Sequence, residues 1–245
     1  MRIKVTLNFD HVLKLPISYN HIIQAFLLKN ISSELADFLH NQGYVYQNRV
    51  FKQFVFSNLF GKYQIEMPNI FFQDEVCFWV ASPISDFLSQ FAESLFKKEL
   101  ELCGQKVVVS SVEIKKLEIK EPKIKIKMLS PMTVYSTLTN GDKKKTYYYS
   151  PFEADFTELI SENLRKKYLA FYPDAETNNF EFKIRPINVQ RYHEKIVKYK
   201  DFIIKGWLGN YELTGSLEVL NFATEAGLGS KNSQGFGCFE IINNE

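Results

Sequence analysis

The feature that most constrains this chain is an order of periodic segments that occurs twice along its 245 residues. Strands are predicted where apolar residues alternate, and helices where they recur every three to four positions. Apart from insertions, each half gives a strand, a helix, two strands, a helix and a strand. This β-α-β-β-α-β order is that of a ferredoxin-like domain. The sequence therefore predicts an α+β fold with two tandem ferredoxin-like (RRM-like) domains, residues 1–120 and 121–245.

The first half contains one boundary signal that stands out. A short predicted helix over residues 33–40 is followed by Gly43, the residue type that commonly ends helices in a left-handed conformation. The remaining segments follow from apolar periodicity alone. The predicted strands are residues 2–9, 51–59, 76–81 and 106–117, and the predicted helices are residues 19–27, 33–40 and 84–95.

The second half begins with strict alternation over residues 123–128, which places Lys123, Lys125 and Lys127 on one face of a strand. Residues 150–153 (SPFE) have capping-box spacing, with proline at the first helical position, so a helix is predicted from Pro151 to about Tyr172. The other predicted segments are a hairpin turn at 140–142, strands at 180–189, 194–199, 202–209 and 236–242, and a helix over 213–223.

Residues 226–237 (AGLGSKNSQGFG) place two glycine pairs around a Lys-Asn-Ser core. Glycine lets successive N–H groups turn into one concavity, and Lys231 adds charge, so the segment predicts a loop that closes on a phosphate. It is not a dinucleotide fingerprint, because Asn232 occupies the third glycine position, and no nucleotide-triphosphate loop occurs in the chain. The simpler alternative is a tight turn between a last helix and a last strand.

Composition excludes several classes of protein. The formal net charge is only +2, so a basic surface has to be local. Three cysteines without a CxxC pair argue against a zinc knuckle and give no even disulfide set, which favours reduced thiols. The chain shows neither a signal pattern nor an apolar run of membrane-spanning length. A cytoplasmic protein without a membrane partner is expected.

Four segments resemble one known family. They are residues 15–21 (LPISYNH), residues 38–44 (FLHNQGY), residues 52–57 (KQFVFS), and the closing Gly-x-Gly, five residues, Gly-Phe-Gly. Together with the predicted architecture, they make nearly the whole chain similar to the CRISPR-associated endoribonucleases that process precursor CRISPR RNA, which belong to the repeat-associated mysterious protein (RAMP) superfamily.

This resemblance implies that the chain binds CRISPR repeat RNA and cuts precursor crRNA once in each repeat. It also implies attack by the RNA's own 2′-hydroxyl, giving a 2′,3′-cyclic phosphate and a 5′-hydroxyl, with no metal and no cofactor. Such chemistry needs a base, an acid and a positive charge beside the phosphate. A homodimer and handover of the RNA to a CRISPR interference complex are further expectations.

By the same resemblance, His40 matches the catalytic histidine and Lys52 the lysine that stabilises the charged phosphate. The C-terminal end of a helix raises the pKa of a histidine and so favours the proton-donating form, and we therefore expect His40 to be the general acid. Where some members carry a tyrosine in the first helix, this chain has Leu28. Tyr44 or Tyr46 is a candidate substitute. The simpler alternatives are a surface cap for His40 and a solvated strand-edge lysine for Lys52.

Two further groups of residues are predicted to contact RNA. The glycine loop is expected to grip the backbone, and the lysines of the 115–127 region form a basic stripe that predicts salt-sensitive binding. The residues concerned are Gly227, Gly229, Ser230, Lys231, Asn232, Ser233, Gly235, Gly237, Lys123, Lys125 and Lys127.

Two other functions stay open at this point. Leu28 favours an RNA-binding protein, or a structural subunit of a CRISPR effector complex, that holds repeat RNA without cutting it. A nucleotide-binding metabolic enzyme of ferredoxin-like fold is a different class, and nothing in the sequence singles it out.

Overall fold

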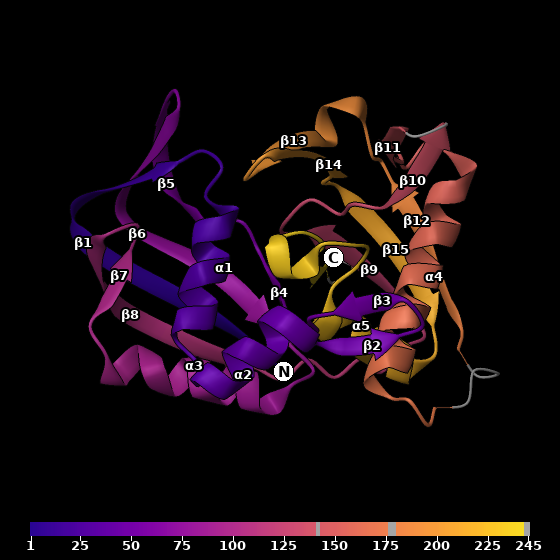
Figure 1. Ribbon diagram of the computed structural model, residues 1–245, viewed down its shortest axis with the longest axis horizontal. Coiled ribbons are helices and arrows are strands. Elements are labelled where there is room, and N and C mark those ends of the chain that lie inside the picture. Colours follow the sequence, from indigo (N-terminus) through magenta and orange to yellow (C-terminus); the bar gives the residue numbers. More distant parts are fainter. Residues whose placement is uncertain (141–142, 176–179, 243–245) are drawn as a thin grey trace.

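The computed structural model describes residues 1–140, 143–175 and 180–242. These residues form two larger antiparallel sheets side by side, one built before residue 116 and one from residue 123 onward (Figure 1). In each sheet the four principal strands follow the spatial order second, third, first, fourth. The predicted α+β fold with two tandem ferredoxin-like units is confirmed.

The first sheet has the order β4-β6-β1-β8-β7, and β5 also pairs with β6. A small separate hairpin, β2-β3, follows the second helix. The strands are β1 (Arg2–Pro16), β2 (Tyr44–Tyr46), β3 (Arg49–Phe51), β4 (Val55–Phe56), β5 (Phe60–Glu66), β6 (Asn69–Ala81), β7 (Leu100–Leu102) and β8 (Gln105–Lys115), and the helices are α1 (Asn20–Lys29), α2 (Ser33–Asp37), η1 (Phe38–Gln42) and α3 (Ser85–Lys97).

Alternation along β1 decides which face of the first sheet is covered. Ile3, Val5 and Leu7 are at most 1% exposed and belong to the core under the helices. From α1, the Phe26 ring meets the Phe91 ring of α3 edge to face, with 6.0 Å between the centroids. Because one face carries the apolar residues, α1 and α3 pack on that side only.

The second sheet has the order β12-β15-β9-β16, and two hairpins lie outside it. Its core includes Phe156, Ile160 and Leu164, which form the buried stripe of the long helix as predicted. The strands are β9 (Lys123–Met128), β10 (Tyr135–Asn140), β11 (Lys143–Tyr148), β12 (Phe182–Ile187), β13 (Glu194–Tyr199), β14 (Phe202–Trp207), β15 (Asn210–Gly215) and β16 (Phe239–Ile242), and the helices are α4 (Ala154–Phe171), η3 (Arg191–His193), α5 (Leu217–Ala226) and η4 (Asn232–Gln234).

The third strand of the second sheet was assigned wrongly from the sequence. Leu213 lies in β15, where it and Tyr211 are fully buried, and α5 begins only at Leu217. The strands predicted at 194–199 and 202–209 instead form the separate hairpin β13-β14. The error arose because Leu213 also fits a helical spacing with Leu217 and Leu220, so the two periodicities coincide over this short run.

Two predicted boundaries also differ from the structure. Helix α4 starts at Ala154, because Ser150 and Glu153 close a turn of their own: the Glu153 N–H donates to the Ser150 oxygen at 3.0 Å, and the Ser150 N–H donates to the Glu153 carboxylate at 2.6 Å. The strand predicted at 51–59 is interrupted at Gln53, whose φ of 54° is left-handed. Gly141 and Asp142 of the predicted turn lie outside the described residues.

The two halves are joined along a continuous seam. The Ser130 hydroxyl donates to the Phe56 oxygen at 3.1 Å, and the Arg2 guanidinium donates to the Phe239 oxygen at 2.8 Å. A small buried apolar cluster crosses the same seam and consists of Val55, Ala81, Leu129 and Cys238. Residues from opposite halves can therefore hold a fixed geometry. The exact domain boundary at residue 120 stays a prediction.

No helix within residues 1–140, 143–175 and 180–242 is long and apolar enough to cross a membrane.

Helix α3 offers a direct test of the predicted core. Phe91 is fully buried and Phe96 is 71% exposed on the same helix. We expect Phe91→Ala to lower the free energy of unfolding by about 3–5 kcal/mol, because it removes a buried ring and leaves a cavity. Phe96→Ala should change it by less than about 0.5 kcal/mol. Denaturant unfolding of both variants checks this, and equal losses would contradict the packing described.

Candidate functional site

The glycine loop, residues 227–237, lies at the centre of the molecule between the two halves (Figure 1). It leaves α5 at Gly227, whose φ is +74°, and returns into β16 through Gly235 and Gly237, whose φ values are +84° and +81°. Its short turn η4 contacts β4 and α1 of the first half. The loop therefore touches both halves although it belongs to the second in sequence.

Asn232 holds the loop together from the inside. Its side chain is only 9% exposed, and Nδ2 donates to the carbonyl oxygens of Leu228 at 3.0 Å and Phe236 at 2.9 Å. The amide that the sequence offered as an RNA contact is thus occupied within the loop. We expect Asn232 to support the loop from inside.

Lys167 of α4 also holds the glycine loop, through its buried ammonium group. Its side chain is 2% exposed, and Nζ donates to the carbonyl oxygens of Gly227 and, at 3.3 Å, Gly229, and to Asn232 Oδ1 at 2.9 Å. Burial lowers the pKa of Lys167 to about 7. The surrounding oxygens oppose this shift, because they favour the charged ammonium.

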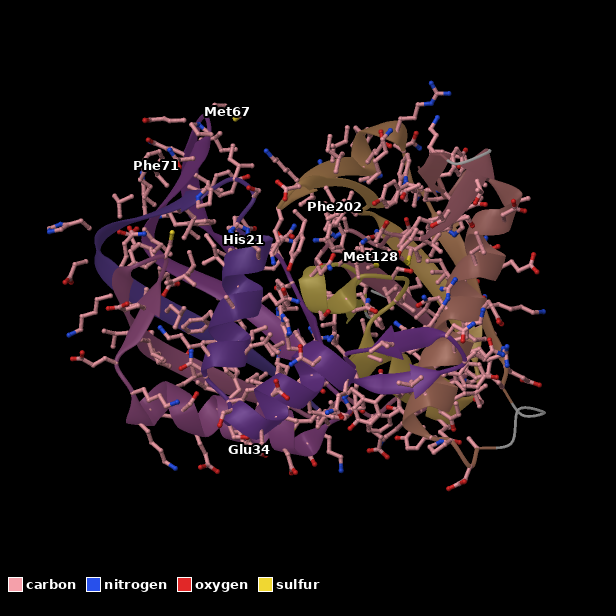
Figure 2. The ribbon with its side chains drawn as sticks, viewed as in Figure 1. His21, Glu34, Met67, Phe71, Met128 and Phe202 are labelled. Carbon is pink, nitrogen blue, oxygen red and sulfur yellow. The ribbon has the colours of Figure 1, made fainter. Side chains whose placement is uncertain are left out.

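Helix α1 of the first half holds the outer part of the loop. Asn20 Nδ2 donates to the Gln234 oxygen at 2.9 Å, and Gln24 Nε2 donates to the Ser233 oxygen at 2.7 Å. The Tyr199 hydroxyl donates to the other end of the Gln24 amide. His21, one turn earlier, packs edge to face on the Tyr199 ring. It lies on the side of α1 that faces the hairpin carrying Phe202 (Figure 2).

The middle of the loop carries backbone N–H groups that are free to bind a ligand. Within the described residues, the backbone N–H groups of Lys231, Asn232 and Ser233 donate to no protein acceptor. Lys231 has a left-handed φ of 63°, and its Nζ lies 5.0 Å from the centroid of the Tyr135 ring. Successive free N–H groups in a turn form a concavity that binds anions. The geometry suits the predicted phosphate contact.

A pocket of about 440 Å³ joins the glycine loop to Lys52 of the first half. Lys52 is half-buried, and this burial lowers its pKa. The positive charges and free N–H groups therefore converge on one cavity. Its lining consists of residues 49–54, residues 229–234, Tyr135, Thr137, Asn163, Lys167 and Ala226.

His40 lies in a π-helical turn, η1, that ends at Gly43. The Gly43 N–H donates to the Phe38 oxygen at 2.7 Å, five residues back, and Gly43 has a φ of +68°, as its predicted capping position requires. Such turns occur frequently at functional sites. Nζ of Lys52 donates to the His40 carbonyl oxygen, so the structure brings the two predicted residues together through the backbone.

Two neighbours fix the orientation of the exposed His40 ring. The Asn41 amide donates from Nδ2 to the Asp37 carboxylate at 2.5 Å, so its Oδ1 faces His40 Nδ1, 2.8 Å away. An amide oxygen only accepts, so Nδ1 carries a proton and donates. Nε2 is consequently the nitrogen that faces solvent and is free to act on a substrate.

Tyr44 is placed as a packing residue. Its ring centroid lies 5.5 Å from that of Phe38 and 5.1 Å from that of Phe171, and burial raises its pKa. It does not line the pocket that contains Lys52. Leu28 is partly buried and packs against the first core. Neither residue brings a hydroxyl to the pocket.

A second cleft, of about 790 Å³, runs between the two sheets. Arg2 is 4% exposed there, and its Cζ lies 4.4 Å from the centroid of the Trp79 ring. Two of its guanidinium nitrogens are buried without a hydrogen-bond partner among the described residues. Predicted residues Lys123 and Lys125 line this cleft, but Lys127 does not. Lys123 is also paired with a carboxylate, that of Glu212, at 3.0 Å.

Sequence reasoning missed Lys167 and Gln53. Lys167 lies on the buried stripe of α4, three residues after Leu164, and a lysine on such a stripe was the available signal. Gln53 is 3% exposed, and its Nε2 donates to the Lys167 carbonyl oxygen at 2.8 Å. Nothing in the sequence distinguishes Gln53 from a solvated strand residue.

No group of three or more His, Cys, Asp or Glu side chains in the described part of the chain is arranged to hold a metal ion.

Comparison with known proteins gives consistent matches. The profile of the family described as "CRISPR associated protein Cas6, C-terminal" matches residues 112–241. The chain is 30% identical to "CRISPR-associated endoribonuclease Cas6 1" of Methanocaldococcus jannaschii, over 100% of this chain and 93% of the relative. A solved "CRISPR associated protein Cas6" superposes with a TM-score of 0.78 at 25% identity, covering 99% of both chains. A structure from "Characterization of a Cas6-related gene from Pyrococcus furiosus" gives 0.84 at 22% identity, covering 100% and 99%.

The tight packing inside the glycine loop predicts that the stability of the protein depends strongly on Gly237. A Cβ there would lie 1.9 Å from the Leu228 oxygen, whereas a Cβ at Gly104, which also has a positive φ, meets nothing within 4 Å. We expect Gly104→Ala to destabilise the protein by about 1 kcal/mol through backbone strain alone. Gly237→Ala should cost on the order of 3 kcal/mol or more. Thermal unfolding measures both, and equal shifts would argue against the described loop.

Proposed function

The chain belongs to the Cas6 family of CRISPR-associated endoribonucleases, and we propose that it binds CRISPR repeat RNA and cuts precursor crRNA within each repeat without a metal ion. One observation carries this proposal. A single pocket combines Lys52, which holds the His40 turn, with the inward-pinned glycine loop and its free N–H groups.

The reaction needs a base, an acid and a positive charge beside the phosphate, and the pocket supplies the positive charge through Lys52. The 2′-oxygen forms a bond to the neighbouring phosphorus while the bond from phosphorus to the 5′-oxygen breaks. A base takes the 2′-hydroxyl proton, and an acid gives a proton to the departing 5′-oxygen. The products are a 2′,3′-cyclic phosphate and a 5′-hydroxyl, so no water or metal ion enters the balance.

We assign the acid to His40. Its Nδ1 is committed to Asn41, so in the charged ring the proton available to the substrate is on Nε2. Asp37 anchors the Asn41 amide and thereby the ring orientation. Lys52 places a positive charge beside the pentavalent phosphate, where charge develops in the transition state. Its bond to the His40 oxygen also sets the distance between the two residues.

The glycine loop would hold a phosphate of the RNA backbone. The N–H groups of Lys231, Asn232 and Ser233 supply donors, and the Lys231 side chain supplies charge. Glycines on either side let the RNA backbone approach closely. This contact positions the RNA without reading its sequence.

For Tyr44 we favour a structural role. Its ring supports the His40 turn through Phe38 and the second half through Phe171. Because burial raises its pKa, deprotonation of the Tyr44 hydroxyl becomes harder, which opposes a role as base.

The second cleft would carry a further part of the repeat. Its Lys115, Lys123 and Lys125 side chains can follow phosphates, and the buried Arg2 guanidinium stacked on Trp79 adds positive charge. Cationic grooves combined with aromatic rings are typical of single-stranded nucleic-acid binding. Lys127 lies outside the cleft lining, and we keep it as a peripheral contact.

A second candidate function rests on Leu28. Without the tyrosine hydroxyl at that position, the chain would bind repeat RNA and deliver it uncut, as an RNA-binding protein or a subunit of an effector complex. The pocket that unites Lys52 with the glycine loop favours the nuclease. Handover to an interference complex, a homodimer and a cytoplasmic location also stay predictions.

Substitution of the two proposed reactive residues tests the nuclease. In EDTA, we expect His40→Ala to slow single-turnover cleavage of repeat RNA by about 10²–10⁴-fold, because the leaving oxygen loses its acid. Lys52→Ala should slow it by about 10²–10³-fold, because transition-state charge loses its partner. Quantified cleavage of end-labelled RNA measures both rates.

The matched controls are His11→Ala and Lys106→Ala, which remove an exposed histidine and an exposed lysine elsewhere in the first half. Both should cleave at the wild-type rate. Unchanged rates in the His40 and Lys52 variants would rule out the assigned roles, and binding without cleavage in the wild type would favour the second candidate.

The second cleft predicts a salt dependence. The slope of log affinity against log salt is negative. Replacing both Lys115 and Lys125 with alanine should make it less negative by about 1.4, since each phosphate contact to a single strand contributes about −0.7. Replacing Lys97 and Lys106 makes the same charge change on another surface and should leave the slope unchanged. Filter binding across a salt series measures the slope of each double variant. Identical slopes in the two double variants would show that the RNA does not bind in the second cleft.

A further inference from the structure

Lys167 is a buried cation with no role in the chemistry described above. It comes from α4, is 2% exposed, and no acidic side chain contributes to its pKa shift, whose cause is burial alone. Its Nζ is surrounded by oxygen atoms of one short segment, those of Gly227, Gly229 and Asn232, with the Ala226 oxygen at 3.5 Å. A buried ammonium costs free energy, so this arrangement calls for an explanation.

The oxygens around Lys167 are ones that no helix can satisfy. Ala226 is the last residue of α5 and Gly227 follows it, so their carbonyl groups lack intrahelical donors. The C-terminal end of a helix also carries partial negative charge, which favours a cation. Lys167 therefore caps α5 and, through Gly229 and Asn232, sets the direction in which the chain leaves the helix.

The backbone of Lys167 makes a second connection. Its carbonyl oxygen accepts from Gln53 Nε2 at 2.8 Å, and the backbone oxygen of Gln53 in turn accepts from the Ser82 hydroxyl at 2.7 Å. Gln53 directly follows Lys52 and has a left-handed φ of 54°, so it turns the chain at that point. One residue of α4 thus holds the Lys52 segment with its backbone and the glycine loop with its side chain.

We propose that Lys167 is a positioning residue that fixes the glycine loop relative to Lys52. Its ammonium holds the Gly227 and Gly229 oxygens and the Asn232 side chain. These anchors adjoin the segment Lys231, Asn232 and Ser233, which lines the pocket and carries the free N–H groups. Lys167 adjoins the pocket, but it is 2% exposed and its Nζ is bonded to loop oxygens, so we assign it no contact with RNA. The consequence for RNA rests on the proposed function, whereas the consequence for the loop does not.

The decisive comparison is Lys167→Met with Lys166→Met. Both remove one positive charge from α4, but Lys166 is partly exposed and is paired with Glu162 at 3.1 Å, away from the loop. Methionine nearly matches the lysine stem and lacks the donors, so Lys167→Met leaves the loop oxygens unsatisfied in a buried site. The Gln53 contact, made by backbone, is retained in both variants.

The first readout is amide hydrogen exchange of the free protein. The N–H groups of Leu228, Ser230 and Gly237 are bonded within the second half and report on the loop without RNA. In Lys167→Met we expect them to exchange at least about tenfold faster, the factor that corresponds to about 1.4 kcal/mol. In Lys166→Met, and at core amides of the first sheet, exchange should match wild type.

The second readout uses repeat RNA with a 2′-deoxy sugar at the cut site, and the same RNA with all its hydroxyls. We expect Lys167→Met to weaken binding about tenfold and to slow single-turnover cleavage at saturating protein as well, since Lys52 and the held phosphate lose their spacing. Lys167→Arg keeps a charged donor and should recover at least part of both losses.

Exchange and binding within twofold of wild type in Lys167→Met would overturn the inference. If that variant fails to fold, Lys167→Gln, which keeps a donor but no charge, replaces it: faster loop exchange supports the inference, and wild-type exchange with wild-type binding overturns it. A wild-type protein that neither binds nor cuts repeat RNA would refute the proposed function, while loop exchange would still decide the role of Lys167.

Discussion

The inward pinning of the glycine-loop carbonyl groups is the constraint on which the rest of the site depends. The Lys167 ammonium and the Asn232 amide together hold the oxygens of Gly227, Leu228, Gly229 and Phe236. These bonds fix the two ends of the loop, and between them the N–H groups of Lys231, Asn232 and Ser233 have no protein acceptor among the described residues. Phosphate is the ligand class that such free N–H groups favour, and Gly237 is required because a Cβ there would collide with the pinned Leu228 oxygen.

The same loop explains why the two halves act as one site. Helix α1 of the first half donates to the loop through Asn20 and Gln24, and α4 of the second half reaches Gln53, next to Lys52. Neither ferredoxin-like unit contains the pocket by itself. The His40 turn is tied in by its backbone oxygen, which accepts from Lys52. Catalysis by an acid and a cation on one phosphate depends on fixed spacing, and these cross-seam bonds supply it.

The sequence was sufficient for the parts that depend on local periodicity and backbone conformation. Most of the strands and helices, the stop at Gly43 and the turning of the glycine loop follow from apolar spacing and from residues that tolerate a positive φ. It was insufficient where tertiary contacts decide. Leu213 fits a helix and a strand equally well until Tyr211 and its neighbours are buried in a sheet. Helical spacing places Lys167 on the buried face of α4, but the neighbouring sequence does not predict which oxygen atoms its ammonium contacts. The segment around Lys52 bends at Gln53 because of a bond to α4, more than one hundred residues away.

In the proposed reaction, the RNA's own 2′-hydroxyl attacks within a site built from Lys52, His40 and the glycine loop. The most direct test is single-turnover cleavage, in EDTA, of repeat RNA and of the same RNA with one 2′-deoxy sugar on the 5′ side of the cut, with mass analysis of the product ends. The account predicts one cut in the unmodified RNA, ending in a 2′,3′-cyclic phosphate, and no cut in the modified RNA. A cut that survives the deoxy sugar, or that needs a divalent ion, would contradict it.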